Sequence, residues 1–237
     1  MQPFKFKKFT LHHHKSPMQI GVDSMMLGAW TETQKINKIL DVGTGCGLLT
    51  FMCAQRNQEC EIHGIDISKE AIEEAEENRL NSPWPEQISF WHKNLKSFEP
   101  PVKYDLIISN PPFFNKQSLQ SVDEARAKAR HSSELCLVDI FNFASQNLSE
   151  DGKFSMVLPY QEFDAVQQLA FQYKFKIQRL STVKPKEHKP PHRILLQLGR
   201  EAKDLDVTEI TIRRLDGSYT DSYKKLTHEY YLDAKVV

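Results

Sequence analysis

A glycine-rich segment between a strand pattern and a helix pattern constrains the fold of this 237-residue chain more than any other feature. Residues 39–42 form a short apolar run typical of a buried strand, and the overlapping segment 41–47 reads DVGTGCG. A helical pattern follows from about residue 48 to residue 58. Glycines at alternate positions permit a tight turn and a close approach of the backbone to a ligand. The sequence therefore predicts a strand, a ligand-contacting turn and a helix in direct succession.

The same alternation of strands and helices continues along the chain. Apolar strands followed by helices predict a parallel sheet covered on both faces, the Rossmann-like doubly wound α/β arrangement. Ser68 is a natural N-cap residue, so a helix is expected to follow it and to run to about residue 80. The further expected strands are 61–65, 88–92, 104–109 and 153–158, and the further expected helices are 138–148 and 161–173.

The last part of the chain departs from this alternation. Residues 177–183 and 194–198 are strand-like, and the segment 184–192 between them is basic and stiffened by prolines. Because no helix fits between the two runs, we expect an antiparallel C-terminal hairpin in a mostly parallel sheet, with residues 207–214 as a further strand. We interpret the chain as a single domain, 1–237, made of an N-terminal segment 1–35, a cofactor-binding core 36–175, and the hairpin with its C-terminal tail, 176–237.

Two acidic residues at strand ends indicate which ligand the turn binds. A dinucleotide-binding turn reads GxGxxG and places a pyrophosphate at the helix N-terminus. Here the third glycine comes one position earlier, and Asp41 lies at the turn, where a carboxylate suits an ammonium or sulfonium group better than a pyrophosphate. Asp66 ends the second strand and can accept hydrogen bonds from both hydroxyls of a ribose. This combination favours S-adenosylmethionine over NAD.

The pattern resembles that of the class I S-adenosylmethionine-dependent methyltransferases. In that family the glycine-rich loop lies against the methionine part of the cofactor, the acid after the second strand binds the ribose, and a residue after the third strand meets the adenine. Asn94 stands at that third position, where the family often has Asp. The resemblance implies that the cofactor-binding residues are Asp41, Gly43, Thr44, Gly45, Gly47, Asp66, Ile67, Asn94 and Asn110.

A second motif, the segment 109–114 (SNPPFF), directly follows the fourth expected strand. The two prolines lack N–H donors and stiffen the turn, so carbonyl oxygens are left to accept hydrogen bonds. Together with the Asn110 side chain they suit an amino group whose hydrogens are held while its nitrogen faces a methyl donor. The motif resembles the (N/D)PP(F/Y/W) signature of amino-methyltransferases. That resemblance implies catalytic roles for Asn110, Pro111, Pro112 and Phe113, with Phe113 stacking on the planar acceptor.

Other segments resemble one subfamily, the bacterial enzymes that methylate N6 of adenine in tRNA. Residues 19–30, 184–193, 193–196 and 226–232 are similar to segments of those enzymes. The resemblance implies methyl transfer from S-adenosylmethionine to adenine-37 of valine tRNA, next to the anticodon. Relatives in this subfamily often have Tyr where this chain has Phe113, a difference that leaves stacking intact.

The charges are unevenly distributed, although the formal net charge is zero. Residues 1–20 carry +4 and include His12–His14, residues 174–200 carry +7, and residues 59–77 carry −7. We expect the acidic block to be a solvated helix face. For the two basic blocks, contact with a polyanion and a merely solvated surface are both open, and a tRNA substrate favours the first.

The remaining features favour a cytoplasmic enzyme that acts without a metal and as a monomer. No apolar run approaches the roughly 20 residues of a membrane helix, the N-terminus lacks the apolar core of a signal peptide, and the four cysteines form no CxxC pair. Three alternatives stay open: glutamine methylation of a release factor, guanine-N2 methylation of rRNA, and a binding module without catalytic activity.

Overall fold

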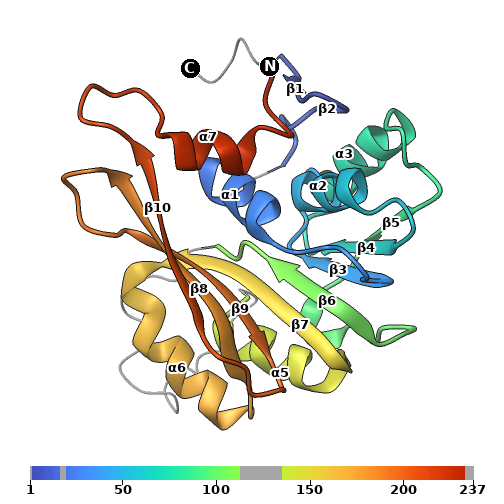
Figure 1. Cartoon of the computed structure of the whole chain (residues 1–237). Coiled ribbons are helices and arrows are strands. Elements are labelled where there is room, and N and C mark those ends of the chain that lie inside the picture. Colours follow the sequence, from blue (N-terminus) through green and yellow to red (C-terminus); the bar gives the residue numbers. More distant parts are fainter. Residues whose placement is uncertain (1, 17–19, 113–134, 233–237) are drawn as a thin grey trace.

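The computed structural model describes residues 2–16, 20–112 and 135–232, and its centre is one eight-stranded sheet (Figure 1). The strand order is β10-β8-β9-β7-β6-β3-β4-β5. The strands are β3 (Lys38–Val42), β4 (Glu61–Asp66), β5 (Ile88–His92), β6 (Tyr104–Ser109), β7 (Leu148–Pro159), β8 (Lys176–Lys186), β9 (Arg193–Gly199) and β10 (Asp206–Arg213).

Only one of these strands runs against the others. β3 pairs in parallel with β4 and β6, β4 with β5, and β6 with β7. β9 is antiparallel to both β7 and β8, whereas β10 is parallel to β8 at the edge of the sheet. The predicted doubly wound, mostly parallel sheet with an antiparallel C-terminal hairpin is therefore confirmed.

Helices cover both faces of the sheet and enclose two apolar cores (Figure 1). Successive residues of a strand face opposite sides, so Ile39 packs into one core and Leu40 into the other. α1 (Val22–Trp30), α2 (Leu48–Arg56), α3 (Lys69–Leu80) and α7 (Asp221–Thr227) contribute to the first core, and α5 (Leu137–Asn147) and α6 (Phe163–Gln172) contribute to the second. Two 3-10 turns, Leu95–Ser97 and Tyr160–Glu162, follow β5 and β7.

The expected elements of the core agree with the structure, and the ends of the chain add elements that the sequence did not indicate. Strands 88–92 and 104–109 coincide with β5 and β6, and the Ser68 hydroxyl accepts a hydrogen bond from the backbone N–H of Ala71 at 3.1 Å, as expected of an N-cap. Helix α2, expected to run to about residue 58, ends at Arg56. The additional elements are α1, α7 and a small hairpin of β1 (Phe4–Lys5) and β2 (Thr10–Leu11).

The β1–β2 hairpin lies beside the C-terminal tail, on the side of the sheet that α2 covers. The backbone N–H of Lys7 donates to the carbonyl of Tyr230 at 2.9 Å. The Tyr230 hydroxyl in turn donates to the carbonyl of Met52 in α2 at 3.2 Å. The two ends of the chain are therefore held together over one helix of the core. No helix in the described part of the chain is long and apolar enough to cross a membrane.

Candidate active site

The predicted site residues gather where the order of the sheet reverses. The chain adds β4 and β5 on one side of β3 and then returns to add β6 and β7 on the other side. Ligands in sheets of this kind bind outside the carboxyl ends of the strands at such a switch point. The glycine-rich turn follows β3, Asp66 ends β4, and Asn110 follows β6, so all three lie at this edge.

The glycine-rich turn depends on backbone conformations that favour glycine. Gly43, Gly45 and Gly47 have φ angles of +73°, +57° and +92°. A Cβ at Gly47 would come within 2.6 Å of the Phe51 ring, whereas one at Gly43 or Gly45 would meet no atom within 4 Å. The first two glycines therefore face open space, which leaves room for a ligand against the turn.

Asp41 is fully buried behind this turn and holds its shape. Its Oδ2 accepts hydrogen bonds from the hydroxyls of Thr44 at 2.7 Å and Thr50 at 2.9 Å, and from the backbone N–H of Thr50 at 3.2 Å. Burial raises the pKa of the Asp41 carboxyl to about 6, and these hydrogen bonds oppose that rise. Within the described residues its Oδ1 has no hydrogen-bond partner. A buried carboxylate oxygen without a hydrogen-bond partner can bind a small ligand group that donates hydrogen bonds or carries positive charge.

Asp66 joins the end of β4 to the glycine-rich turn. Its Oδ2 accepts a hydrogen bond from the backbone N–H of Gly45 and its Oδ1 one from the N–H of Ser68, both at 2.9 Å. Each carboxylate oxygen has a second lone pair, so both can still accept from a ribose. The next residue, Ile67, exposes 55% of its surface. An exposed aliphatic side chain beside this acid leaves an apolar surface at the same edge of the sheet.

Asn94 follows β5 and begins the 3-10 turn there. Its Oδ1 accepts a hydrogen bond from the backbone N–H of Lys96 at 2.9 Å. This oxygen has a second lone pair that can accept from the amino group of an adenine, and Nδ2 can donate to a ring nitrogen of the purine. The amide of Asn94 is therefore suited to both kinds of contact with the edge of an adenine.

Asn110 is almost completely buried, with 9% of its surface exposed. Its Nδ2 donates to the hydroxyl of Ser24 at 2.7 Å, and the preceding Ser109 donates its hydroxyl to the carbonyl of Val42 in β3 at 2.8 Å. Pro111 is buried and Pro112 is exposed. Phe113 lies outside the described residues. The end of β6 is thus tied both to β3 and to helix α1.

The sequence did not single out the first turn of α1 as part of this site. Ser24 contacts Asn110, and the neighbouring Asp23 pairs with Arg193, the first residue of β9, at 2.9 Å. The only sequence signal was the resemblance of residues 19–30 to the tRNA-methylating subfamily, which carries no indication of a contact with residue 110. The structure brings the N-terminal segment, the second motif and the C-terminal hairpin together here.

The basic block 174–200 divides between the two ends of the strands, the amino-terminal end and the carboxyl-terminal end at which the site lies. Lys174 and Lys176 lie where β8 begins, away from the site. At the carboxyl edge, the turn after β8 lies beside the turn after β10, because the N–H of Glu187 donates to the carbonyl of Arg213 at 3.1 Å (Figure 1). We call the basic side chains at the ends of β8 and β10, in the turns that follow them and at the start of β9 the carboxyl-edge patch; it consists of Lys184, Lys186, Lys189, Arg193, Arg213 and Arg214.

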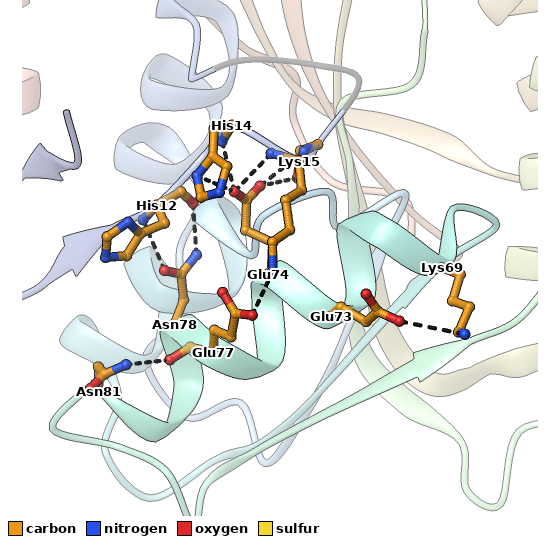
Figure 2. Close-up of polar contacts among 10 residues, drawn as sticks. His12, His14, Lys15, Lys69, Glu73, Glu74, Glu77, Asn78 and Asn81 are labelled. Carbon is orange, nitrogen blue, oxygen red and sulfur yellow. Dashed lines mark hydrogen bonds and ion pairs between the residues drawn. The ribbon is translucent and has the colours of Figure 1, made fainter. Parts of the chain in front are cut away.

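The basic block 1–20 does not form a free arm, because residues 12–16 are docked on α3 (Figure 2). The carboxylate of Glu74, which is fully buried, accepts hydrogen bonds from the N–H groups of His14, Lys15 and Ser16 at 2.7–2.9 Å and from the Ser16 hydroxyl at 2.8 Å. The Lys15 ammonium pairs with Glu77 at 2.5 Å. The acidic block is therefore not only a solvated face: it also holds the N-terminal segment.

Burial and hydrogen bonds shift the pKa of the Glu74 carboxyl in opposite directions. Burial by itself raises the pKa of this carboxyl, but the hydrogen bonds from Lys15, Ser16 and His14 outweigh it and hold the pKa below its ordinary value of 4.5. The carboxylate form is thus the stable one in the folded protein.

Asn78, one helical turn after Glu74, links the docked segment to the glycine-rich turn. Its Oδ1 accepts from the N–H of His12 at 2.8 Å, and its Nδ2 donates to the carbonyl of His12 at 2.9 Å (Figure 2). The Nδ2 group also donates to the carbonyl of Cys46 at 3.0 Å. Cys46 belongs to the turn after β3. Among residues 2–16, 20–112 and 135–232, no group of three or more His, Cys, Asp or Glu side chains is placed to hold a metal ion.

Comparison with known proteins agrees with this geometry. The family model of the methyltransferase small domain matches residues 19–179. Proteins named tRNA1(Val) (adenine(37)-N6)-methyltransferase are similar over nearly the whole chain. The one from Vibrio campbellii is 40% identical over 97% of this chain and 95% of its own length, and the one from Bacteroides thetaiotaomicron is 34% identical over 98% of both.

Solved structures share the fold at low sequence identity. A predicted O-methyltransferase from Agrobacterium tumefaciens, protein Atu636, superposes with a TM-score of 0.67 over 88% of this chain and 96% of its own, at 16% identity. The ribosomal protein L11 methylase of Lactobacillus delbrueckii subsp. bulgaricus gives a TM-score of 0.56 over 76% and 77%, at 22% identity. The chain therefore belongs to the methyltransferase small domain family and, within it, to the family of the tRNA1(Val) (adenine(37)-N6)-methyltransferases.

Proposed function

We propose that this protein transfers a methyl group from S-adenosylmethionine to N6 of an adenine in tRNA, specifically adenine-37 of valine tRNA. The relatives that are similar over 97% of the chain carry that activity in their names. The observation that carries the proposal is the position of Asn110, which lies directly beside the glycine-rich turn at the switch point of the sheet. A methyl donor on the turn and an amino group on Asn110 would then be neighbours.

The residues at the turn fit the proposed cofactor. S-adenosylmethionine supplies a methyl group on a positively charged sulfonium, which makes that methyl electrophilic. The open space at Gly43 and Gly45 gives room for the methionine part, and the buried Oδ1 of Asp41 offers a negative acceptor nearby. Asp66 would hold the ribose, Ile67 would lie against the cofactor, and Asn94 would form hydrogen bonds with the edge of the adenine.

At the acceptor side, Asn110 and Pro111 would hold the target amino group. The Oδ1 of Asn110 and the carbonyl of Pro111 accept its two hydrogens, because the prolines of this turn offer no N–H donors in their place. Holding both hydrogens directs the nitrogen lone pair toward the methyl group. The proton leaves after the transfer, when the nitrogen carries positive charge, so this scheme needs no general base in the pocket.

Phe113 would stack on the extruded base, a contact worth roughly 1–3 kcal/mol. Extrusion from a duplex costs a few kcal/mol and less from a loop, which suits a target beside the anticodon. We also propose that the protein works as a monomer, and in the cytoplasm, where a tRNA substrate is found.

The carboxyl-edge patch is the proposed contact for the phosphates of the tRNA. It lies at the same edge of the sheet as Asn110, and its Lys186 and Lys189 make no ion pair within the described residues. Contacts with phosphates release counterions, so the dissociation constant for tRNA should rise steeply between about 50 and 200 mM salt.

A paired substitution tests this assignment. Lys186→Gln combined with Lys189→Gln should make the plot of the logarithm of the tRNA association constant against the logarithm of the salt concentration less steep, by about 1–2 in slope. The matched control, Lys174→Gln with Lys176→Gln at the opposite edge, should leave the slope at the wild-type value. Equal slopes for both double variants in filter-binding measurements would exclude the carboxyl-edge patch as the contact.

Asp66→Ala should weaken the binding of S-adenosylmethionine by about 10- to 150-fold. The ribose hydroxyls would lose a charged acceptor, and a hydrogen bond to a charged group contributes about 1.5–3 kcal/mol. Isothermal titration calorimetry measures the effect, with Asp151→Ala, an exposed residue of β7, as the control. An unchanged dissociation constant for Asp66→Ala would show that the ribose lies elsewhere.

The experiment that tests the proposed function follows a labelled methyl group. The protein is incubated with methyl-labelled S-adenosylmethionine and, in separate reactions, with total tRNA, ribosomal RNA or a peptide-chain release factor. We expect label in the tRNA only. Label in the release factor would establish glutamine methylation instead, and label in ribosomal RNA would favour guanine methylation. No transfer, together with no cofactor binding in calorimetry, would identify a binding module.

A further inference from the structure

The first turn of α1 places a hydroxyl group against the amide of Asn110. The Oγ of Ser24 accepts a hydrogen bond from Asn110 Nδ2 at 2.7 Å. Ser24 and Asn110 are 86 residues apart in the chain, and the contact is partly buried. It therefore arises from the tertiary structure and lies at the edge of the site.

This contact fixes the place of the Asn110 amide. An asparagine side chain has a donor end, the NH2 group, and an acceptor end, the carbonyl oxygen. The NH2 group donates to Ser24, so the carbonyl oxygen Oδ1 lies at the other end of the amide. Because a hydroxyl can donate as well as accept, the contact holds the side chain in place and does not by itself choose between its two ends.

Helix α1 is held firmly enough to keep Ser24 in this position. Met25 and Met26 in its middle are completely buried or nearly so. A Cβ at Gly28 would come within 2.5 Å of the Met52 sulfur, so α1 and α2 are in close contact there. At the C-terminal end of the helix, Arg56 donates to the carbonyls of Ala29 at 3.0 Å and Thr31 at 2.6 Å.

The N-terminal end of α1 is held as well. Asp23, next to Ser24, pairs with Arg193 of β9 at 2.9 Å. Arg193 also donates to the carbonyl of His192 at 3.0 Å. The position of Ser24 is thus set by the C-terminal hairpin on one side and by the core on the other.

We propose that Ser24 is a positioning residue for methyl transfer: its hydroxyl holds the Asn110 amide in the place from which its carbonyl oxygen can accept from the target amino group. This inference rests on the proposed function, because only an amino-group acceptor requires that end of the amide. A donor end in the same place would repel the hydrogens of the amino group and leave them unheld.

Steady-state kinetics of Ser24→Ala and Ser24→Thr test the proposal. Ser24→Ala removes one neutral hydrogen bond, so kcat should fall on the order of tenfold, while KM for tRNA and for the cofactor changes by less than about twofold. Ser24→Thr keeps the hydroxyl and should recover most of kcat. Thermal unfolding of both variants should match the wild type. The control Ser145→Ala removes an exposed hydroxyl on α5 and should leave kcat unchanged.

The outcomes separate this inference from the proposed function. An active wild type with an unaffected Ser24→Ala variant overturns the positioning role and leaves the proposed function standing. Equal losses in Ser24→Ala and Ser24→Thr, or a loss expressed in KM alone, also overturn it. A wild type that transfers no methyl group to tRNA contradicts the proposed function instead.

Discussion

Replacing Asn110 by alanine is expected to lower kcat for methyl transfer by on the order of 10²–10³-fold. In the proposed scheme its side chain is a preorganised acceptor for the target amino group, and removing one such group from an active site typically costs that much. The side chain is almost completely buried and anchored by Ser24, so no neighbouring group can easily take its place. The measurement is single-turnover transfer of a labelled methyl group to tRNA.

Cofactor binding and stability provide the controls for this variant. The dissociation constant for S-adenosylmethionine should stay within a few-fold of the wild-type value, because the glycine-rich turn and Asp66 are unchanged. Asn142→Ala makes the same chemical change on an exposed part of α5 and should retain full activity. If Asn110→Ala kept more than about a tenth of the wild-type rate, Asn110 would not be the group that holds the amine.

Glu74→Gln is expected to lower the free energy of unfolding by about 2–4 kcal/mol. Three backbone N–H groups and one hydroxyl point at its buried carboxylate, and an amide would turn its own NH2 group toward some of these donors. For a chain of this size the loss corresponds to a decrease of about 5–15 °C in the melting temperature. Denaturant unfolding followed by circular dichroism measures it.

Glu77→Gln is the matched control for Glu74→Gln. Glu77 lies on the same helix and pairs with Lys15 in solvent, where an ion pair adds little to stability. Its free energy of unfolding should therefore stay close to the wild-type value. Equal effects of the two substitutions would mean that general charge on α3, and not the docking of residues 12–16, stabilises this region.

The effect of Glu74 should depend on pH in one direction. Because the pKa of Glu74 is lower in the folded than in the unfolded protein, its stabilising contribution is complete above pH 4.5 and disappears as the pH falls through the folded-state value. The difference in stability between wild type and Glu74→Gln should therefore shrink as the pH falls below 4.5. A difference that stayed the same or grew below pH 4.5 would contradict the hydrogen-bonding account.

The central sheet could be predicted from the sequence because its signals are local. Short apolar runs, a glycine-rich turn and an N-cap at Ser68 each report on neighbouring residues, and the structure has the corresponding elements. Helix α1 could not be predicted in the same way. All residues from 25 to 30 are buried, so the helix has no polar face and no amphipathic period to reveal it.

The residues of the site could be predicted from the sequence, but the hydrogen bonds that join them to distant segments could not. The two motifs and Asp66 follow strands that share one edge, which the expected sheet already implied. The contacts of Ser24 with Asn110 and of Glu74 with residues 14–16 join segments 58 to 86 residues apart, and no local pattern specifies such partners. For the same reason, the charge blocks could be counted from the sequence, but the docking of the basic segment on the acidic helix required the structure.

Nucleoside mass spectrometry of tRNA methylated by the protein tests the central claim most directly. Purified valine tRNA without modification is incubated with the protein and S-adenosylmethionine, then digested and analysed together with the Asn110→Ala control. The account predicts one new product, N6-methyladenosine, in the fragment that contains position 37, and almost none with the variant. A methylated guanosine, a methyl group at another position of the tRNA, or equal product with the variant would contradict it.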